Sequence, residues 1–412
     1  MGNKNTKLQT KPKDGVKGRA VSRNQELKRA TREMSCVQDE MKRKRTGAGD
    51  TIPPPNKQEL EEEDVQAGHD LAKHLISISP FNKRWQVKRT INEGTFGVVF
   101  EVRDIETNVN GVIKVAKSNV DCNGWEAFIL EKQQRANPSS SVVRILDKGV
   151  LADQNGQGLE FICLEKAEIQ VMDYLNQVTQ SDGNKCNDSK FTGVERRLHV
   201  TYVLLDMLKG IHDLHMQGLL HRDSKPDNMG IYSEKQPMAV LFDLGLARMY
   251  TGYFGEIRLP RSTVSFRGTP EWASGHAQKG REQGRIDDLI AWMYVGIELY
   301  DESKNPMQPL PWTGRENTEV LRYLKSMYAP ARLLFRHTPR QFFAINSYLM
   351  TANRFEAPDY RFLAKLIERA IDELQITVEE QTGFKQNRYS KPADKQAPNS
   401  QQVQSSQPLS AA

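Results

Sequence analysis

The sequence has few cysteines and no long apolar run. Its four cysteines, in a chain of 412 residues, are scattered and form no Cys-x-x-Cys pair, so neither a disulfide framework nor a zinc site is expected. No stretch approaches the roughly eighteen apolar residues of a membrane span, and the N-terminus lacks the apolar core of a secretory signal. We therefore expect a protein of a reducing compartment, in the cytoplasm or the nucleus.

Positive charge is concentrated at one end of the chain. The 58 Lys and Arg residues exceed the 52 Asp and Glu residues by 6, but residues 1–50 alone carry 14 basic and 6 acidic side chains, a net of +8. The rest of the chain is therefore close to neutral. The basic segment lacks interleaved aromatic residues, so a specific nucleic-acid site is not expected there.

The two ends of the chain have the composition of disordered tails. Residues 1–80 are rich in charge and contain a Pro-Pro-Pro run, and residues 381–412 are rich in Gln, Ser and Pro. Such segments bury too little apolar surface to offset the entropy of ordering. We predict a short helix at most near residues 70–75, and a folded domain over residues 81–380.

The folded part changes character along its length. Val, Phe and Thr are frequent in residues 85–104 on both sides of a glycine-containing turn, which predicts strands. Apolar residues then recur at helical spacing from about residue 200, with Gly218 placed to end that helix, and residues 289–300 are apolar nearly all round. This pattern predicts an α+β fold with a small sheet lobe, residues 81–166, and a larger helical lobe, residues 167–380.

A glycine-containing turn and a buried lysine stand near the start of the folded domain. Gly94 and Gly97 lie in Asn92-Glu93-Gly94-Thr95-Phe96-Gly97-Val98-Val99 and allow backbone amides to approach phosphate oxygens. Lys114 lies in the apolar strand Val112-Ile113-Lys114, where a charged amine needs an anion. Taken alone, a structural hairpin and a lysine that reaches solvent are the preferred explanation of these residues.

Two short loops further along the chain indicate a chemical function for the turn and the lysine. They read His221-Arg222-Asp223-Ser224-Lys225-Pro226-Asp227-Asn228 and Leu241-Phe242-Asp243-Leu244-Gly245. Their carboxylates and amide suit Mg²⁺ and a hydroxyl beside a triphosphate. The complete set resembles the protein-kinase signature of glycine-rich loop, strand lysine, catalytic loop and metal-binding Asp.

Further segments narrow the resemblance. Phe266-Arg267-Gly268-Thr269, Arg285-Ile286-Asp287-Asp288-Leu289 and Pro358-Asp359-Tyr360 are similar to the casein kinase 1 group, and most similar to its tau-tubulin-kinase-like and nematode-expanded branch. The likeness extends from about residue 85 to residue 374. It implies a two-lobed kinase fold with one helix in a mainly antiparallel small lobe, and transfer of the γ-phosphoryl group of ATP to Ser or Thr of protein substrates.

The resemblance also implies a role for individual residues. Asp223 would take the substrate hydroxyl proton, and Lys225 would contact the γ-phosphate. Asn228 and Asp243 would bind Mg²⁺. Lys114 would hold the α- and β-phosphates, oriented by Glu126 or, as the second choice, by Glu131. The remaining nucleotide contacts would come from Ile91, Gly94, Gly97, Val99 and the connector residues Glu165 and Ala167.

One departure from the signature, together with the long tails, leaves an alternative open. Asn92 stands where the first loop glycine is usual. No Ala-Pro-Glu ends the activation segment, where Pro270-Glu271-Trp272-Ala273-Ser274 stands instead, but the casein kinase 1 group also lacks that motif. Asn tolerates left-handed backbone better than most residues, so the turn can survive. A catalytically silent pseudokinase that acts as a scaffold is the alternative to an active enzyme.

Basic residues crowd the activation segment and the residues after it. They indicate either a surface for acidic or already phosphorylated substrates, as the resemblance also implies, or a solvated face with salt bridges. They are Arg248, Arg258, Arg261, Arg267, Lys279, Arg281 and Arg285. Asp288, at the start of the apolar helix, is predicted to anchor the backbone of the catalytic loop, and His212 and His215 are predicted to pack rather than to bind metal.

The N-terminal segment contains two possible address signals. Met1-Gly2-Asn3-Lys4-Asn5-Thr6 fits the N-myristoylation pattern, and the lysines after it would supply the second, electrostatic signal for peripheral membrane association. Lys28-Arg29 and residues 42–45 fit a two-part nuclear address. A solvated tail is the default explanation of both. We expect a monomer.

Overall fold

The computed structural model describes residues 57–94, 97–116, 123–176, 193–232, 238–301, 310–315, 317–328, 332–353 and 355–383. The Gly2 motif, the basic clusters of residues 28–45 and the segment 384–412 lie outside these residues. Within the described part, no helix has the length and apolar character needed to cross a membrane.

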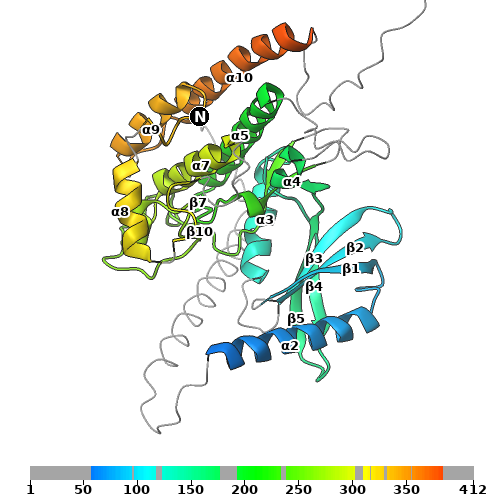
Figure 1. Ribbon diagram of the computed structural model, residues 1–412. Helices are drawn as coiled ribbons and strands as arrows, with labels where there is room; N and C mark the ends of the chain where they lie inside the picture. Colours follow the sequence, from blue (N-terminus) through cyan, green and yellow to red (C-terminus); the bar gives the residue numbers. More distant parts are fainter. Residues whose placement is uncertain are drawn as a thin grey trace, which may run out of the picture.

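The small lobe is built on one antiparallel sheet of five strands. Alternate residues of its second strand, Val98, Phe100 and Val102, are buried on one face, as the period of two in a strand requires. The strands lie in the order β1-β2-β3-β5-β4 (Figure 1). Their bounds are β1 Trp85–Gly94, β2 Gly97–Asp104, β3 Asn110–Ala116, β4 Ile145–Ala152 and β5 Gly158–Glu165.

A helix, α3 (Asn123–Ala136), connects the sheet to the larger lobe. Its residues Ala127, Ile129 and Leu130 belong to a buried cluster that also contains Leu219 and Leu244 of the larger lobe. The carboxylate of Glu126 on this helix is therefore held between the two lobes by apolar packing. This is the one helix expected in the small lobe.

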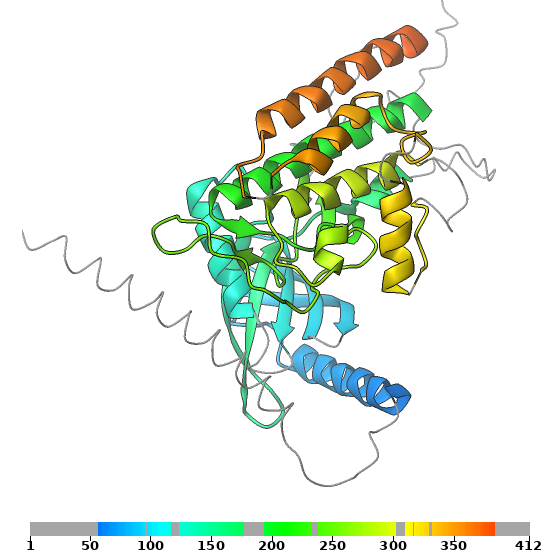
Figure 2. The same cartoon turned by 90° about the vertical axis from the view of Figure 1, so that its left-hand side faces the viewer.

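A second helix in the small lobe differs from the expectation of a disordered tail through residue 80. Helix α2 (Lys57–Ser77) runs along the side of the sheet that faces away from the larger lobe (Figures 1 and 2). Its buried residues Ala72 and Leu75 join Phe81 and Trp85 in the core of the sheet. The short helix expected near residues 70–75 is thus longer and part of the lobe.

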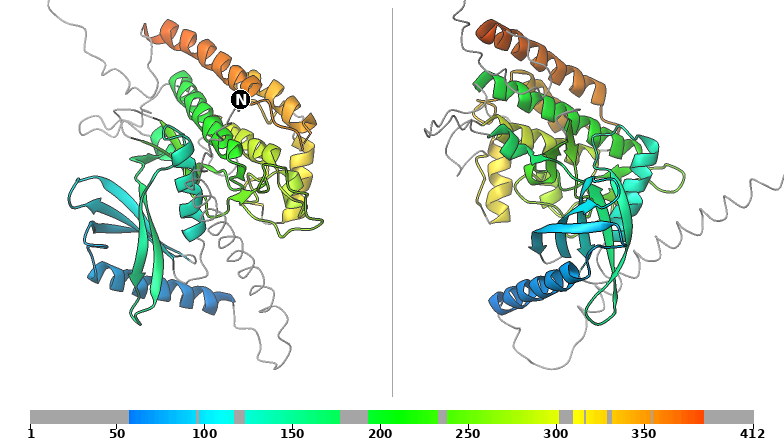
Figure 3. Two further views of the ribbon diagram at one scale, coloured as in Figure 1. Left: turned by 180° about the vertical axis from the view of Figure 1, so that it is seen from behind. Right: turned by 90° about the vertical axis from the view of Figure 1, so that its right-hand side faces the viewer.

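The larger lobe is mainly helical. Three long helices, α5, α7 and α10, enclose the main core, and α10 lies alongside α5 in both views of Figure 3. The helices are α4 Val171–Leu175, α5 Gly193–Met216, α6 Gly275–Gln278, α7 Arg285–Tyr300, α8 Thr318–Tyr328, α9 Gln341–Thr351 and α10 Tyr360–Thr382. Short pieces carry the loops between them: β6 Ile169–Gln170, β7 Leu219–Leu220, the 3-10 helix η1 Pro226–Asn228, β8 Met229–Ile231, β9 Ala239–Leu241 and β10 Arg248–Met249.

The predicted α+β fold of two lobes is confirmed. Helix α5 ends two residues before Gly218, which has the left-handed φ of 76° that favours glycine. Every residue of α7 except Glu298 is buried, as its apolar sequence predicts. Helix α10 ends at Thr382, close to the predicted end of the domain at residue 380.

Candidate active site

Lys114 connects the two lobes through two carboxylates. Its amine on β3 lies 3.0 Å from Oε1 of Glu126 on α3 and 3.2 Å from Oδ1 of Asp243, which comes after β9. The backbone amide of Leu244 donates to the same Glu126 oxygen at 3.1 Å. The structure therefore brings Lys114, Glu126 and Asp243 together, although Asp243 is 129 residues from Lys114 in sequence.

The second choice for the lysine partner lies elsewhere. Glu131 is on the same helix, but its carboxylate pairs with Lys148 of β4 at 2.7 Å. The two glutamates also differ in burial: Glu126 is 3% exposed, whereas Glu131 is partly open to solvent. Glu126 is thus the glutamate that faces Lys114.

The charges of this cluster stabilise one another. Burial opposes the charged form of Lys114, but the carboxylates of Glu126 and Asp243 raise its pKa above the ordinary value. Burial likewise opposes the charged form of Asp243, and the Lys114 amine holds the pKa of Asp243 below its usual range. Both groups are therefore charged at neutral pH, which is the state needed to hold phosphates and a cation.

Asp223 is held by the activation segment. Its Oδ1 accepts hydrogen bonds from the backbone amide of Thr269 at 2.8 Å and from the Thr269 hydroxyl at 2.7 Å. The Lys225 amine lies 3.7 Å from its Oδ2. The carboxylate thus has a fixed orientation and a cation nearby but beyond hydrogen-bond distance, an arrangement that suits a group that accepts a proton beside a phosphate.

Asn228 links the catalytic loop to the strand that leads to Asp243. Its amide nitrogen donates to the carbonyl oxygen of Asp223 at 2.9 Å, and its own backbone carbonyl accepts from the amide of Phe242 at 3.1 Å. This use of the side-chain nitrogen leaves the side-chain oxygen as the atom suited to a cation. Mg²⁺ takes few protein ligands when phosphates complete its shell, so Asn228 and Asp243 fit such an ion.

Buried groups behind the loop fix its backbone. Asp288, on α7, accepts from the amides of His221 and Arg222, each at 2.8 Å, and from His215 at 2.9 Å. Burial would raise the pKa of Asp288, but the hydrogen bond from His215 and the other donors hold it below its usual value. The predicted anchoring role of Asp288 is confirmed. His215 also contacts the Tyr360 hydroxyl at 2.6 Å.

A glycine in the activation segment allows that segment to approach the catalytic loop closely. Gly268 has a φ of 108°, and a Cβ there would lie 2.4 Å from the carbonyl oxygen of Arg222. Arg222 itself has a left-handed φ of 69°. A side chain at position 268 would clash with the carbonyl oxygen of Arg222. A glycine is therefore required there for Thr269 to reach Asp223.

The predicted nucleotide contacts in the small lobe lie on β1 and β2, and β2 pairs with the strand of Lys114. Gly94 pairs with Gly97 across the end of the β1–β2 hairpin, and a Cβ on Gly97 would lie 2.1 Å from the carbonyl oxygen of Val115. Val99 is opposite Lys114 in the ladder, and Ile91 on β1 is 45% exposed. Residues 95 and 96 at the tip lie outside the described part, so the contact of the tip stays a prediction.

The connector between the lobes comes after β5. The amide of Glu165 donates to the carbonyl oxygen of Arg144 at 2.8 Å, so Glu165 cannot offer this amide to a nucleotide. Its carboxylate accepts from Arg144 at 2.6 Å and 2.7 Å. Ala167, two residues further, is partly buried against the interlobe cluster. The expected contact of these residues with adenine stays a prediction.

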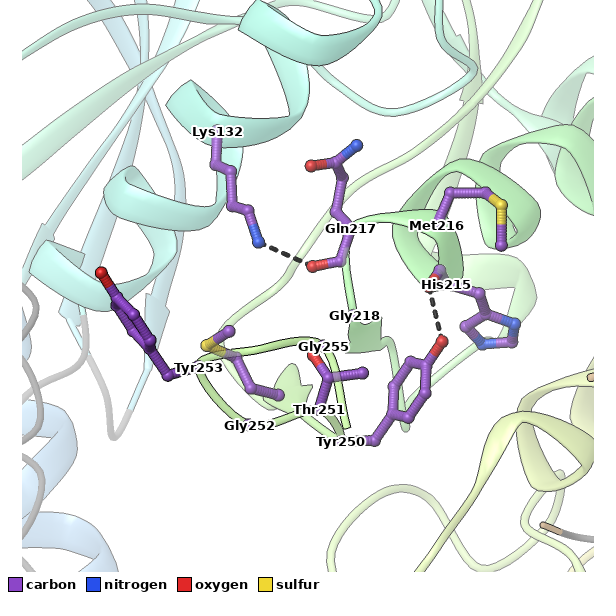
Figure 4. A pocket seen from close by; sticks show the side chains of 11 residues that line it. Lys132, His215, Met216, Gln217, Gly218, Tyr250, Thr251, Gly252, Tyr253 and Gly255 are labelled. Carbon is purple, nitrogen blue, oxygen red and sulfur yellow. Dashed lines mark hydrogen bonds between the residues drawn. The ribbon is translucent and has the colours of Figure 1, made fainter. Parts of the chain in front are cut away.

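A separate cavity of about 580 Å³ lies behind the site, where α3, the end of α5 and the activation segment meet. Lys132 of α3 donates to the carbonyl oxygen of Gln217 at 2.7 Å, and the Tyr250 hydroxyl donates to the carbonyl oxygen of His215 at 2.7 Å. Figure 4 draws both hydrogen bonds as dashed lines. None of the predicted site residues lines this cavity. Its walls connect the helix of Glu126 to the activation segment.

Three features of the site were not predicted from the sequence. They are the two donors of Thr269, the link from His215 to Asp288, and the position of Arg222, whose guanidinium donates to the carbonyl oxygen of Leu246 at 2.7 Å. The only signal in the sequence was that Arg222 and Thr269 stand inside motifs already selected for other residues.

The sequence is similar to known proteins. Residues 85–308 match the family model described as protein kinase domain, which is 224 of the 412 residues. A Dictyostelium discoideum protein named as a probable serine/threonine-protein kinase is 29% identical over 298 residues, covering 71% of this chain and 55% of the relative. The chain thus spans only about half of that relative. The serine/threonine-protein kinase spe-6 of Caenorhabditis elegans is 25% identical over 339 residues, covering 80% of this chain and 82% of the relative.

Proposed function

Because this chain belongs to the protein kinase domain family, we propose that it transfers the γ-phosphoryl group of ATP to Ser or Thr hydroxyls of protein substrates. The observation that carries the proposal is the contact of Lys114 with both Glu126 and Asp243, beside an Asp223 that Thr269 holds in place. The names of both relatives support the choice of Ser and Thr.

In this mechanism the residues of the chain act mostly by placement and charge. Lys114, held by Glu126, binds the α- and β-phosphates, and Asp223 orients the substrate hydroxyl and accepts its proton as the phosphoryl group leaves ATP. Lys225 neutralises charge on the transferred group. Asn228 and Asp243 would hold Mg²⁺, which would neutralise charge on the phosphate oxygens.

Two measurements distinguish an active enzyme from the pseudokinase alternative. Thermal stabilisation by Mg²⁺ and ATP reports nucleotide binding, and phosphoamino-acid analysis of radiolabelled casein reports transfer to Ser or Thr. We expect both stabilisation and transfer in the unaltered protein, and loss of the stabilisation by ATP in Lys114→Met. Stabilisation without transfer in the unaltered protein would favour the scaffold, and label on Tyr alone would contradict the assigned acceptor.

The finer family assignment is part of the proposal. The segments that resemble the casein kinase 1 group cover the activation segment, the start of α7 and the start of α10. In the structure, the first and second of these meet at the catalytic loop, where Thr269 and Asp288 each bind it. Thr269 binds Asp223 in the unmodified chain, so we expect transfer to casein without phosphorylation of the activation segment.

A preference for acidic or phosphorylated substrates is supported by the charges beside the catalytic loop. Arg248 and Arg261 share one carboxylate, that of Glu282, at 3.1 Å and 2.5 Å. Burial and the nearby charge of Arg248 lower the pKa of Arg222 to about 10. Two guanidinium groups paired with one carboxylate leave an excess of positive charge, and guanidinium groups suit phosphate.

Peptide arrays with and without phosphorylated residues test this preference. We expect faster transfer to the phosphorylated set and loss of this difference in Arg261→Ala. The control is Arg369→Ala, an exposed arginine of α10 that is not part of this surface. Arg285 is not part of this surface, because it is buried, stacks on Tyr250 at 5.0 Å and donates to the carbonyl oxygen of Phe355. Equal rates on both sets would reject the preference.

Location in the cell is a further part of the proposal. The basic clusters of residues 28–45 and the acylation pattern at Gly2 support a nuclear and a peripheral membrane pool beside a cytoplasmic one. Deletion of residues 28–45 is expected to lower the nuclear fraction. Intact mass of the protein from its native host reports whether Gly2 carries a myristoyl group.

A further inference from the structure

The segment from Thr269 to Ser274 lies next to the catalytic carboxylate without being part of a regular element. Its first residue binds Asp223 through two donors. Its last residue, Ser274, caps the short helix α6 by accepting from Ala277 at 3.0 Å and also donates to Asp287 of α7. The backbone between these two ends needs other partners, because carbonyl groups removed from water need donors.

Lys325 supplies the donor for two of these carbonyls. It lies on α8, is 3% exposed, and its amine donates to the carbonyl oxygens of Pro270 at 2.7 Å and Ala273 at 2.6 Å. The amine also lies 5.3 Å from the ring centroids of Tyr294 and Trp312. It forms no ion pair with any residue in the described part of the chain.

Neighbouring side chains hold the same backbone from the same side. The indole of Trp312 donates to the carbonyl oxygen of Glu271 at 2.9 Å, and the amide of Gln278 donates to that of Pro270 at 2.6 Å. The carbonyl groups of residues 270, 271 and 273 are thus bound by side chains of the larger lobe. Of these three side chains, Lys325 is the one that binds two carbonyls.

Burying an amine that forms no ion pair with the described residues costs free energy. A residue that only filled space would not need an amine at this position. Burial lowers the pKa of Lys325 to about 7, which is the expected response of an amine removed from water. An apolar side chain of similar length, such as Met, would fill much of the same volume without that cost. The gain from Lys325 is therefore the hydrogen bonding of the two carbonyls and the attraction of the amine to two aromatic faces.

We propose that Lys325 is a positioning residue for phosphoryl transfer, which fixes the backbone of residues 270–273 and thereby holds Thr269 against Asp223. The inference rests on the proposed kinase function of the same site. The segment 269–274 also borders the place where a substrate hydroxyl must approach Asp223. Lys325 therefore affects the turnover and the binding of the protein substrate, and leaves the ATP site, which is built from Lys114, Glu126 and Asp243, unchanged.

Steady-state kinetics of Lys325→Met test the proposal. Arg322→Met is the matched control, because Arg322 is a half-buried basic residue one turn earlier on the same helix that pairs with Glu319. We expect kcat/KM for a peptide substrate to fall about tenfold or more, with KM for ATP within about twofold of the unaltered protein. Lys325→Arg, which retains donors, is expected to recover part of the loss. All rates are normalised to the fraction of protein that binds ATP, so that partial unfolding does not count as a catalytic effect.

Hydrogen exchange gives a readout that does not need activity. The amide of Ala273 donates to the carbonyl oxygen of Thr269 at 3.1 Å, and its exchange is expected to accelerate in Lys325→Met but not in Arg322→Met. If Lys325→Met does not fold, Trp312→Phe is the second variant. It removes the indole donor to the same segment, together with part of the buried ring beside Lys325, and is expected to show a smaller effect of the same kind.

The outcomes separate this inference from the function on which it rests. Absence of transfer by the unaltered protein contradicts the kinase function, while faster exchange at Ala273 in Lys325→Met still supports the positioning role. Normal transfer by the unaltered protein, with peptide kcat/KM and Ala273 exchange unchanged in Lys325→Met, overturns the inference. A uniform loss of stability with unchanged kinetics per ATP-binding site overturns it as well.

Discussion

Thr269 donates both its backbone amide and its hydroxyl to a single oxygen of Asp223, at 2.8 Å and 2.7 Å. The residue that takes the substrate proton in the proposed mechanism is therefore oriented by the activation segment and not by its own loop alone. Gly268 allows this contact, Asp288 fixes the opposite side of the catalytic loop, and Lys325 binds the residue after Thr269.

We predict that Thr269→Val lowers kcat by about tenfold, because the hydroxyl donor is lost while the backbone donor and the side-chain volume remain. KM for ATP is expected to change little. The measurement is steady-state transfer to casein, with Thr263→Val in the exposed part of the same segment as the control. A kcat equal to that of the unaltered protein would show that the hydroxyl has no part in orienting Asp223.

Glu126 and Glu131 provide a matched pair on one helix. Glu126→Gln removes the charge that faces Lys114, so transfer efficiency with respect to ATP is expected to fall by about tenfold to a hundredfold. Glu131→Gln breaks only an ion pair with a half-exposed Lys148 and is expected to leave kinetics unchanged. A larger loss in Glu131→Gln than in Glu126→Gln would reverse the assignment of the lysine partner.

Glu298 predicts a dependence of stability on pH. Burial raises its pKa from 4.5 to about 7, and the hydrogen bond from Trp272 offsets only part of that rise. The folded protein therefore binds the proton more tightly than the unfolded chain between these values, and the stabilisation is lost as the pH rises through 7.

Glu298→Gln keeps the hydrogen-bond acceptor but removes this titration. Relative to Glu298→Gln, the unaltered protein is expected to lose on the order of 2 kcal/mol of unfolding free energy between about pH 5 and about pH 8. Denaturant unfolding of both proteins at several pH values measures the difference. Parallel pH curves for the two proteins are incompatible with a raised pKa at Glu298.

Helix α2 contributes to the stability of the small lobe. Leu75 is fully buried, so Leu75→Ala is expected to lower the free energy of unfolding by about 2 to 4 kcal/mol. Its neighbour Ile76 is 46% exposed, and Ile76→Ala is expected to cost less than about 1 kcal/mol. Thermal unfolding of the two variants, compared with the unaltered protein, decides whether α2 is part of the folded lobe.

The sequence predicts those parts of the fold and the site that are determined by short, contiguous patterns of residues. Residues 289–300 form a buried helix because nearly all of them are apolar, and the residues around Lys114, Asp223 and Asp243 stand in short motifs whose chemistry is readable without a structure. Glu126 could be preferred over Glu131 only by resemblance, and the structure then placed it 3.0 Å from Lys114.

The parts that could not be predicted depend on contacts between distant segments. Thr269 is 46 residues from Asp223, and Lys325 is 55 residues from Pro270, and neither residue type indicates a carboxylate or a carbonyl partner by itself. Helix α2 was underestimated for a different reason. Most of its residues are polar or charged, and only the few apolar positions near Ala72 and Leu75 pack on the sheet, so its composition indicates a solvated tail.

The proposed activity is tested by transfer of radiolabel from the γ-position of ATP to casein, compared between the unaltered protein and Asp223→Asn. We predict Mg²⁺-dependent transfer by the unaltered protein and a loss of at least about a hundredfold in Asp223→Asn, with thermal stabilisation by ATP retained in both. Equal transfer by the two proteins, or none by an unaltered protein that binds ATP, would contradict the assignment of Asp223 and of the kinase activity.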